Sequence, residues 1–284
     1  MEIIPEVKKN LYRLEIDLAP YLYDHHFEGR AILPAAEALI IMAKAVKILY
    51  PEIHVLCLSA ARFPRFLALM PDAKKQTIMI KLKKGESDVS VALLTAVKAK
   101  TNKISRMIEH AFVEFNNISD SKPAPVSFRG AAKLSGACIS IPSETIYREL
   151  VVFGKAYQNI TGDLSVSSSG ALGYLSAGEA QADEETLGSP FPFDALMHMA
   201  CVWGQRFADM VAFPVGFEKR IIYQQTRKEG DYLGRVVPKA TSEKRLIFDG
   251  WIYDANGVLC EEITALEMRD VSGGRLRPPS WISG

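Results

Sequence analysis

Hydrophobic and polar residues alternate along several short stretches at the beginning of the chain. Alternation with a period of two is typical of a half-buried β-strand. The first such stretch is NLYRLEIDL, at residues 10–18. The polar sequences DAKK, KGESD and KTNK provide turns between further strands, so this part is predicted to form antiparallel strands. The further strand-like stretches are residues 54–67, 75–84, 89–99 and 105–115.

A helical pattern interrupts these strands directly after Pro34. Proline is tolerated in the first turn of a helix, because its missing N–H group would have no partner there. From Ala35 to about Tyr50 the residues favour a helix, and apolar side chains recur every three or four positions on one face. Pro51 is expected to end this helix, which therefore buries a single apolar face.

The second part of the chain repeats this plan. IPSETIYRELVVFG predicts a short helix with Ser143 as its N-cap, and ITGDLSVSSSGALGYLSA predicts strands. After a loop, QADEETLGSPFPF, a long apolar helix is predicted from Asp194 to about Val211. DANG is a hairpin turn between the last two of four closing strands. These strand-like stretches are residues 216–226, 231–239, 244–254 and 259–271.

Each part thus contains one apolar helix and about four antiparallel strands that follow it. Such a helix can bury itself only in the concave face of a curved sheet. We therefore predict an α+β fold of two similar units that arose by duplication, although the two units share little sequence identity. The first unit spans residues 1–120, a polar linker spans residues 121–140, and the second unit spans residues 141–284.

Composition and charge narrow the class of protein. The chain has 284 residues, of which 34 are basic and 33 acidic, and this gives a net charge of +1. Proteins that bind nucleic acid usually carry a strong basic excess, so a nucleic-acid partner is not expected. No stretch approaches the ~20 apolar residues that span a bilayer, and the N-terminus lacks an apolar signal region. A cytoplasmic protein without a membrane association is therefore predicted.

The cysteines do not indicate a metal site. Cys57, Cys138, Cys201 and Cys260 are scattered through the chain, and no two form a CxxC pair. Isolated cysteines in apolar stretches are typical of buried thiols in a reducing compartment. We predict no bound metal.

Two short motifs hold the candidate catalytic residues. HHFEGRAILP contains His25, Gly29 and Pro34, and this spacing resembles the HxxxGxxxxP motif of polyketide synthase dehydratase domains. FDALMH resembles the second motif of that family, in which an aspartate is followed four residues later by glutamine or histidine, here Asp194 and His198. IYRELVVFGKAY and DANGVLCEEITALEMRDV also resemble parts of the family, so the resemblance covers nearly the whole chain.

The resemblance implies a double-hotdog fold with an active site between the two units. It implies a dehydratase, a hydro-lyase that removes water from a β-hydroxyacyl thioester in polyketide or fatty acid biosynthesis. The substrate would be carried on the phosphopantetheine of an acyl carrier protein, and no further cofactor is implied. The family often has Tyr-Gly-Pro where this chain has Tyr157 followed by Gln and Asn. Tyr157 is therefore a candidate substrate-binding residue in a tunnel whose local shape differs.

The reaction assigns a role to each residue. A neutral histidine has a pKa near ~6.5, which suits His25 as the base that removes the α-proton. Asp194 must donate a proton to the leaving hydroxyl, and its apolar neighbours are expected to raise its pKa. His198 lies one turn further along the same helix face and can orient the Asp194 carboxyl. The helix that begins near Pro34 offers N–H groups to the enolate oxygen, and Gly29 allows the backbone to approach the thioester.

Each assignment has a structural alternative. A histidine that precedes a helix is commonly a surface or capping residue, and Asp194 could be only an N-cap. His198 could be an ordinary core residue. His26 is expected to point away from the site, and His110 lies in a strand-like stretch and is expected to be structural.

Two other functions stay open at this point. A product-template-like cyclase would share the fold and the histidine–aspartate pair. A catalytically inactive hotdog module would bind acyl groups only, although the presence of both His25 and Asp194 argues against it. A homodimer of whole chains is possible, since closed two-fold dimers are the commonest oligomers. We expect the site to be complete within one chain.

Overall fold

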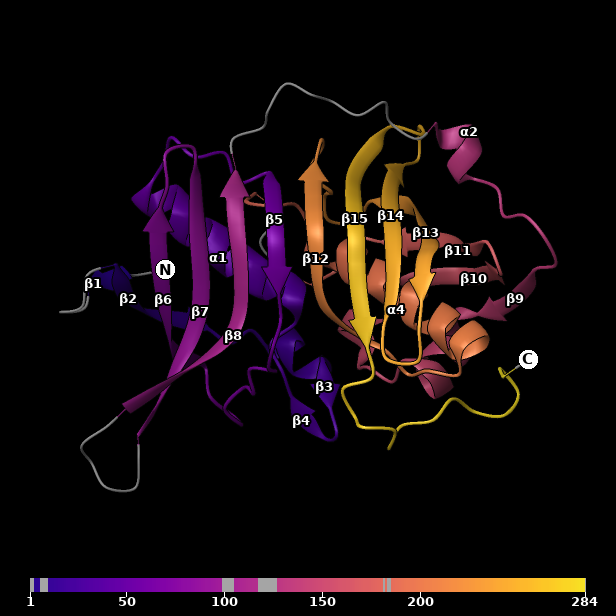
Figure 1. Ribbon diagram of the computed structural model, residues 1–284, viewed down its shortest axis with the longest axis horizontal. Helices are drawn as coiled ribbons and strands as arrows, with labels where there is room; N and C mark the ends of the chain where they lie inside the picture. The colour runs from indigo at the N-terminus through magenta and orange to yellow at the C-terminus, as the bar shows by residue number, and fades with distance from the viewer. Residues whose placement is uncertain are drawn as a thin grey trace.

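The computed structural model of the chain describes residues 3–5, 10–98, 105–116, 127–180, 182 and 185–283. Within these ranges the chain forms one large antiparallel sheet with two helices packed behind it (Figure 1). Among the described helices, none has both the length and the apolar character needed to cross a membrane.

The first half of the chain supplies one end of the sheet. Its helix α1, Ala35–Leu49, begins and ends within one residue of the prediction. A 3₁₀ helix, η1 (Pro20–Asp24), and a small hairpin of β3 (His26–Phe27) and β4 (Arg30–Ala31) precede α1. The sheet strands of this half are β1 (Ile3–Pro5), β2 (Leu11–Asp17), β5 (Cys57–Arg62), β6 (Lys75–Lys84), β7 (Asp88–Lys98) and β8 (Ser105–Asn116).

The second half supplies the other end and the long helix α4, Pro190–Ala208. Four short helical segments precede α4, and they are α2 (Phe128–Ala131), α3 (Ser143–Thr145), η2 (Ile146–Leu150) and η3 (Lys155–Tyr157). The sheet strands of this half are β9 (Ile139–Pro142), β10 (Ile160–Ser167), β11 (Gly170–Ser176), β12 (Phe213–Ile222), β13 (Asp231–Thr241), β14 (Leu246–Asp254) and β15 (Leu259–Arg269).

One strand pair joins the two halves. Among the described residues the strand order is β1-β2-β6-β7-β8-β5-β12-β15-β14-β13-β11-β10-β9. β5 of the first half pairs with β12 of the second, with Cys57 opposite Ile221 and Arg62 opposite Gly216. Figure 1 shows these two strands side by side at the centre of the sheet, with α1 and α4 behind it. The two helices also contact each other, so both halves share one interior.

Apolar burial explains why the sheet curves around the helices. On α1, the side chains of Leu39, Met42 and Val46 are fully buried. On α4, every residue from Pro190 to Gln205 is buried, including polar Asp194 and His198. A helix that is buried on all sides must be covered by several strands, and α4 contacts β10, β11, β12, β13 and β14.

The predicted start of the second helix is wrong by one turn. α4 begins at Pro190, and its N-cap is Ser189, whose hydroxyl accepts a hydrogen bond from the Phe191 N–H group. The prolines in SPFPF suggested a loop, but proline is favoured at the first helical position. Asp194 therefore lies inside the helix and is not its N-cap. The helix ends before Asp209, which adopts a left-handed conformation with φ of 48°.

Two further sequence predictions differ from the structure. Ser143 is the first residue of α3 and not its N-cap, because extended Pro142 precedes it and no side chain caps the helix. The linker region contains the short helix α2, and its last two residues already belong to β9. The predicted KTNK turn and residues 117–126 of the linker region lie outside the described residues.

Candidate active site

A tight hairpin fixes the position of His25. The chain turns at Glu28 and Gly29, which have φ of 48° and 75°, and returns so that Ile32 N–H donates to the His25 carbonyl at 2.9 Å. The His25 Nδ1 atom lies 3.2 Å from the Ile32 carbonyl oxygen. Because a carbonyl can only accept, Nδ1 carries the ring proton when the ring is neutral. The Nε2 atom of His25 is then unprotonated and can accept a proton.

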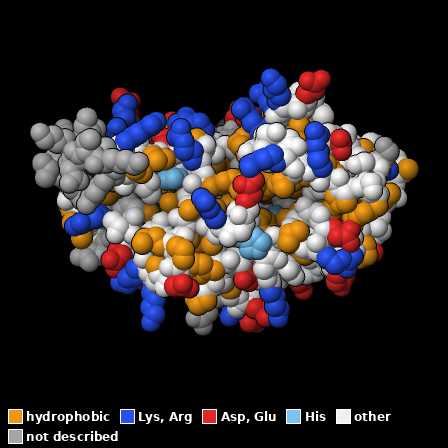
Figure 2. All heavy atoms as spheres, turned by 90° about the horizontal axis from the view of Figure 1, so that it is seen from below, with side chains coloured by type: hydrophobic (Ala, Val, Ile, Leu, Met, Phe, Trp, Pro, Cys, Tyr) orange, Lys and Arg blue, Asp and Glu red, His pale blue; other side chains and the backbone are white. Residues whose placement is uncertain are grey.

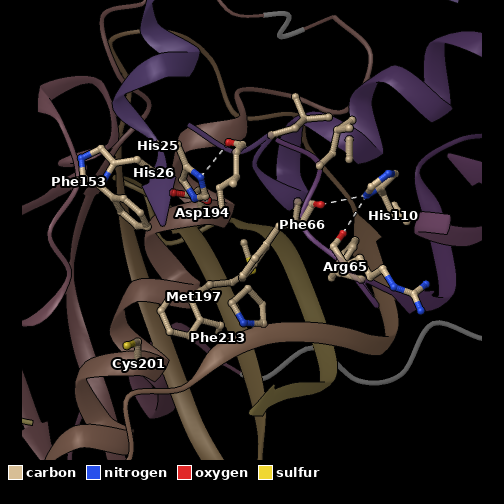
Figure 3. Close-up of a pocket in the computed structure, with 18 of the residues that line it drawn as sticks. His25, His26, Arg65, Phe66, His110, Phe153, Asp194, Met197, Cys201 and Phe213 are labelled. Atoms are coloured by element: carbon tan, nitrogen blue, oxygen red, sulfur yellow. Dashed lines mark hydrogen bonds and ion pairs between the residues drawn. The ribbon is translucent and has the colours of Figure 1, made fainter. Parts of the chain in front are cut away.

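Asp194 faces this Nε2 atom from the other half of the molecule. The distance from His25 Nε2 to Asp194 Oδ1 is 4.0 Å, and the two side chains are 12% and 4% exposed. Figure 3 shows them on the same side of one cavity, with His25 above Asp194. The fold thus brings together two residues that the sequence placed in separate motifs.

Two polar side chains, His198 and then Tyr147, lie next to Asp194 on the side away from His25. The Nε2 atom of His198 lies 3.0 Å from Asp194 Oδ2. The hydroxyl of Tyr147 lies 3.4 Å from His198 Nδ1 and accepts a hydrogen bond from the Ile160 N–H group at 2.7 Å. The Tyr147 hydroxyl proton is therefore free to point at Nδ1, which leaves the Nε2 proton of His198 directed at the carboxyl. His198 lies one turn beyond Asp194 on α4, as its spacing predicted, whereas Tyr147 was not predicted.

The surroundings shift the pKa values of both residues downward. Burial lowers the pKa of His25 to about 4, although the charge of Asp194 partly opposes this shift. Burial raises the pKa of Asp194. The charge of His198, the hydrogen bond from His198 and the charge of His25 together lower this pKa by more, so it lies below the ordinary value of an aspartate. The expectation that apolar neighbours raise the pKa of Asp194 is therefore wrong for the free protein.

Aromatic rings pack around the histidines. The Phe153 ring stacks on His25, with centroids 4.3 Å apart and planes 20° apart, and lies 5.1 Å from the His198 ring. Tyr157 meets the edge of the His25 ring at 5.1 Å. Phe153 was missed as a site residue, although it lies in the same VVFGKAY stretch that contains Tyr157 and resembles the family.

Asp24 connects the His25 segment to the second half. Its side chain accepts a hydrogen bond from the Ala156 N–H group at 2.9 Å, and its carbonyl accepts one from Gly154 at 2.8 Å. A Cβ atom on Gly154 would lie 2.4 Å from Cγ of Asp24, so only glycine permits this contact. The residue directly before His25 is thus held by the segment that carries Phe153 and Tyr157.

The remaining predicted residues occupy different places. Gly29 lies in the hairpin turn, where a Cβ atom would meet nothing within 4 Å, and it is not part of the cavity lining. Its left-handed φ serves the turn, and the expected approach of this backbone to a thioester stays a prediction. Pro34 precedes α1, and Ala35 and Ala38 of the first turn line the cavity. Tyr157 is fully buried behind His25 and is also absent from the lining.

The cavity is built from both halves and is lined mainly by apolar side chains. It also contains His26 and His110, which the sequence had placed outside the site. In the view from below, histidine side chains lie among hydrophobic ones, with acidic and basic groups intermixed around them (Figure 2). Within the described residues, no group of His, Cys, Asp and Glu side chains could hold a metal ion. The apolar lining from the two halves includes Leu33, Phe63, Leu67, Leu93, Val151, Met197, Cys201, Phe213 and Met268.

The fold is a double hotdog, and a histidine from one half and an aspartate from the other lie side by side in a cavity between the halves. The sequence profile described as "Polyketide synthase dehydratase N-terminal domain" matches residues 135–278, which include β9 to β15. The chain therefore belongs to the polyketide synthase dehydratase family. No curated protein sequence matches the chain.

Solved structures support the fold. The dehydratase domain from the CurJ module of curacin polyketide synthase is similar with a TM-score of 0.74 and 15% identity, over 94% of each chain. The dehydratase domain from the CurF module of the same synthase is similar with a TM-score of 0.70 and 19% identity, over 94% of this chain and 96% of that domain. The PpsC dehydratase domain of Mycobacterium tuberculosis, in complex with C12:1-CoA, is similar with a TM-score of 0.69 and 18% identity. The match covers 94% of this chain and 97% of that domain. The double-hotdog prediction is confirmed.

Family membership also confirms the predicted class of reaction. Polyketide synthase dehydratases are hydro-lyases that remove water from β-hydroxyacyl thioesters, and this is the activity of the chain. The match favours this reaction over the cyclase and the inactive binding module.

Proposed function

We propose that His25 and Asp194 are the base and the acid of this dehydration. The observation that carries the proposal is the 4.0 Å separation between His25 Nε2, which is free to accept a proton, and Asp194 Oδ1. A separation of this size is too long for a hydrogen bond, so each atom is available to a substrate placed against both. One base and one acid on a single substrate are what a β-elimination requires.

The proton transfers follow from this arrangement. His25 Nε2 removes the α-proton, and the electrons of the C–H bond form the α,β double bond. The β C–O bond breaks as Asp194 donates its proton to the hydroxyl, which leaves as water. The reaction ends with a protonated His25 and an ionised Asp194. Transfer of the proton from His25 back to Asp194, directly or through one water, restores both groups.

The low pKa of Asp194 in the free protein sets a condition on this mechanism. Among the influences on this carboxyl, burial raises the pKa, and the two histidines lower it. An uncharged acyl chain that fills the cavity removes water, which raises the cost of ionising Asp194 and also strengthens the attraction of its carboxylate to a charged histidine. The mechanism requires the first effect to be the larger, so that Asp194 holds its proton in the bound state.

The first turn of α1 stabilises the enolate oxygen. The first N–H groups of a helix have no partner within the helix, and the helix dipole favours negative charge there. Ala35 and Ala38 line the cavity, so this end of α1 faces the space that a thioester would fill. Pro34 contributes by setting the extended conformation from which the helix begins.

The acyl group is proposed to arrive on the phosphopantetheine of an acyl carrier protein. The mechanism needs only a base, an acid and hydrogen-bond donors, and the chain supplies all of these, so no further cofactor is proposed. The complex of the similar PpsC domain with C12:1-CoA supports a thioester on this arm, because coenzyme A also contains phosphopantetheine.

The test is dehydration of β-hydroxyacyl pantetheine thioesters, followed through the absorbance of the enoyl product. We expect His25→Ala and Asp194→Asn each to reduce kcat by roughly 10²–10⁴, the usual contribution of a general acid or base. His54→Ala is the matched control, because His54 is exposed and does not line the cavity. Wild-type rates in both site variants would overturn the assignment.

A further inference from the structure

A further histidine, His110, lies on the opposite side of the same cavity. His110 belongs to β8 and lines the cavity together with Arg65 and Phe66. Figure 3 shows His25 and Asp194 at one side and these three residues at the other. The mechanism described above makes no use of His110.

A β-bulge directs the His110 side chain into this position. In the β7–β8 pair, Leu93 lies opposite Ala111 and Leu94 opposite Glu109, so His110 is an extra residue with no partner across the strands. Such bulges interrupt the alternation of a strand and redirect a side chain, frequently beside active sites. The His110 ring can therefore reach across to the segment that follows β5.

The contacts of the ring determine which nitrogen carries the proton. Nδ1 lies 3.3 Å from the Arg65 carbonyl oxygen and 3.1 Å from that of Phe66, while Nε2 lies 2.8 Å from the Thr95 hydroxyl. Carbonyl oxygens only accept, so Nδ1 carries the proton, and the Thr95 hydroxyl donates to Nε2. Burial lowers the pKa of His110, which keeps the ring neutral at neutral pH. Both nitrogens are thus occupied by protein groups.

The Arg65–Phe66 backbone, whose carbonyls contact His110, forms part of the cavity wall. The Phe66 ring lies 4.9 Å from Phe27 of the β3–β4 hairpin and 6.2 Å from Phe213 of β12. These three rings come from three separate segments and from both halves of the molecule. Phe66 is 38% exposed and lines the cavity together with Phe213, so the wall also forms part of the rim.

We propose that His110, fixed by Thr95, is a positioning residue that holds the Arg65–Phe66 backbone in place and thereby determines which acyl chains the cavity accepts. The inference rests on the proposed function, since it assigns a specificity role within the same site. Loss of the Thr95 hydroxyl leaves Nε2 without its donor, so the ring loses the contact that fixes it, and its Nδ1–H group no longer holds the two carbonyls in one position. Because this backbone is partly exposed, water can replace the lost bonds, so the fold survives while the wall moves.

The first measurement is the protonation state of the ring in the whole protein. Nitrogen-15 NMR of histidine-labelled protein distinguishes the two neutral tautomers, and the chain has only five histidines to assign. We expect the Nδ1–H form for His110 in the wild type and in Thr95→Ser, which keeps the hydroxyl. In Thr95→Val the proton should stay on Nδ1, because the two carbonyls still accept from it, but the Nε2 resonance should shift as this atom loses its hydrogen-bond donor. An Nε2–H ring in the wild type would overturn the proposal.

The second measurement is selectivity between β-hydroxybutyryl and β-hydroxydodecanoyl pantetheine thioesters. In Thr95→Val and His110→Phe we expect the ratio of the two kcat/KM values to change by about five-fold or more. In Thr95→Val the kcat for the short substrate should stay within about two-fold, because His25 and Asp194 are untouched, and Thr95→Ser should behave as wild type. An unchanged ratio in Thr95→Val would overturn the proposal.

The two proposals can fail separately. If the wild type dehydrates neither thioester, the proposed function fails, and calorimetric affinities for the same two thioesters replace kcat/KM as the measure of selectivity. A ratio of affinities that shifts in Thr95→Val but not in Thr95→Ser supports the role of His110. Equal ratios in all three proteins contradict it.

Discussion

At the scale of single residues, the neutral state of His25 depends on burial outweighing a nearby carboxylate. A histidine beside an aspartate usually gains a proton more easily, yet the pKa of His25 falls to about 4 because its ring is removed from water. The consequence is a base that is unprotonated across the physiological pH range. Phe153, stacked on the ring at 4.3 Å, contributes to this removal of water.

This burial makes the stability of the protein depend on pH. The pKa of His25 is 6.5 in the unfolded chain and about 4 in the folded one. Between these values the unfolded chain binds more protons, so the free energy of unfolding decreases as the pH falls from ~6.5 towards 4, by at most about 3 kcal/mol for this residue. Urea unfolding of wild type and His25→Asn across this range measures the effect. An equally steep loss in both proteins would show that His25 is not the cause.

Replacement of His198 by glutamine should move the activity to higher pH. The charge of His198 lowers the pKa of Asp194, whereas a glutamine amide carries no charge and can still donate from the same helix position. We expect His198→Gln to stay active, with the alkaline limb of its kcat–pH profile shifted upward, since Asp194 keeps its proton longer. His198→Leu is the control and should lose activity because it cannot donate. An alkaline limb that moves downward would contradict this account.

His25, Asp194 and His198, which the structure brings together, could be proposed from the sequence because each lies in a short motif with fixed spacing. The supporting residues could not be found in this way. Tyr147 reaches His198 only after the chain folds, and Asp24 depends on a close approach by Gly154. His110 looked like an ordinary strand residue, because a bulge cannot be read from alternation alone.

At the scale of elements, the short segments on either side of the cavity determine the geometry of the site. η1 ends at Asp24, and η3 begins directly after Gly154. The hydrogen bond from the Gly154 N–H group to the Asp24 carbonyl therefore connects these two short helices directly before His25. Most strands and α1 were predicted because alternation and apolar periodicity are local signals. The start of α4 was not, since Pro190 is compatible both with a loop and with a first helical turn.

A methyl group on residue 154, next to Asp24, should displace His25, the proposed base. In Gly154→Ala the new Cβ atom would lie 2.4 Å from Cγ of Asp24, and the carboxyl would have to move. We expect kcat to fall by about ten-fold to a hundred-fold, because small displacements of a catalytic group are costly. Activity and urea unfolding should be measured together with those of Gly29→Ala.

Gly29→Ala is the matched control for this substitution. Its Cβ atom would have free space, and only the left-handed φ of 75° is unfavourable. We expect a stability loss of about 1–2 kcal/mol and a smaller loss of activity than in Gly154→Ala. Equal activity losses in the two variants would show that the contact with Asp24 does not position His25.

At the scale of the whole molecule, each half contributes one member of the proposed catalytic pair. His25 follows η1 in the first half, and Asp194 lies on α4 in the second, yet their atoms are 4.0 Å apart within one chain. The second half alone contains Asp194 without its base, and the first half contains the base without an acid. The site therefore requires both units, which the sequence indicated by placing the two motifs in different halves.

A mixing experiment tests whether the site is complete within one chain. An inactive His25→Ala chain and an inactive Asp194→Asn chain are combined, and subunit exchange is verified with two labels. We expect the mixture to stay inactive, since every chain lacks one member of its own pair. Recovery of dehydration after mixing would mean that His25 of one chain acts with Asp194 of another.

The pairing of β5 with β12 also limits how a substrate can arrive and how a product can leave. Gly216 of β12 lies so close to β5 that a Cβ atom would be 2.3 Å from the Ala61 carbonyl oxygen, and the ladder of hydrogen bonds continues across this contact. The two halves cannot separate like a hinge without breaking that ladder. Substrate entry and product release must instead depend on small movements of the rim of the cavity, where Phe66 is 38% exposed. The speed of those movements then sets an upper bound on turnover that is independent of the acid and the base.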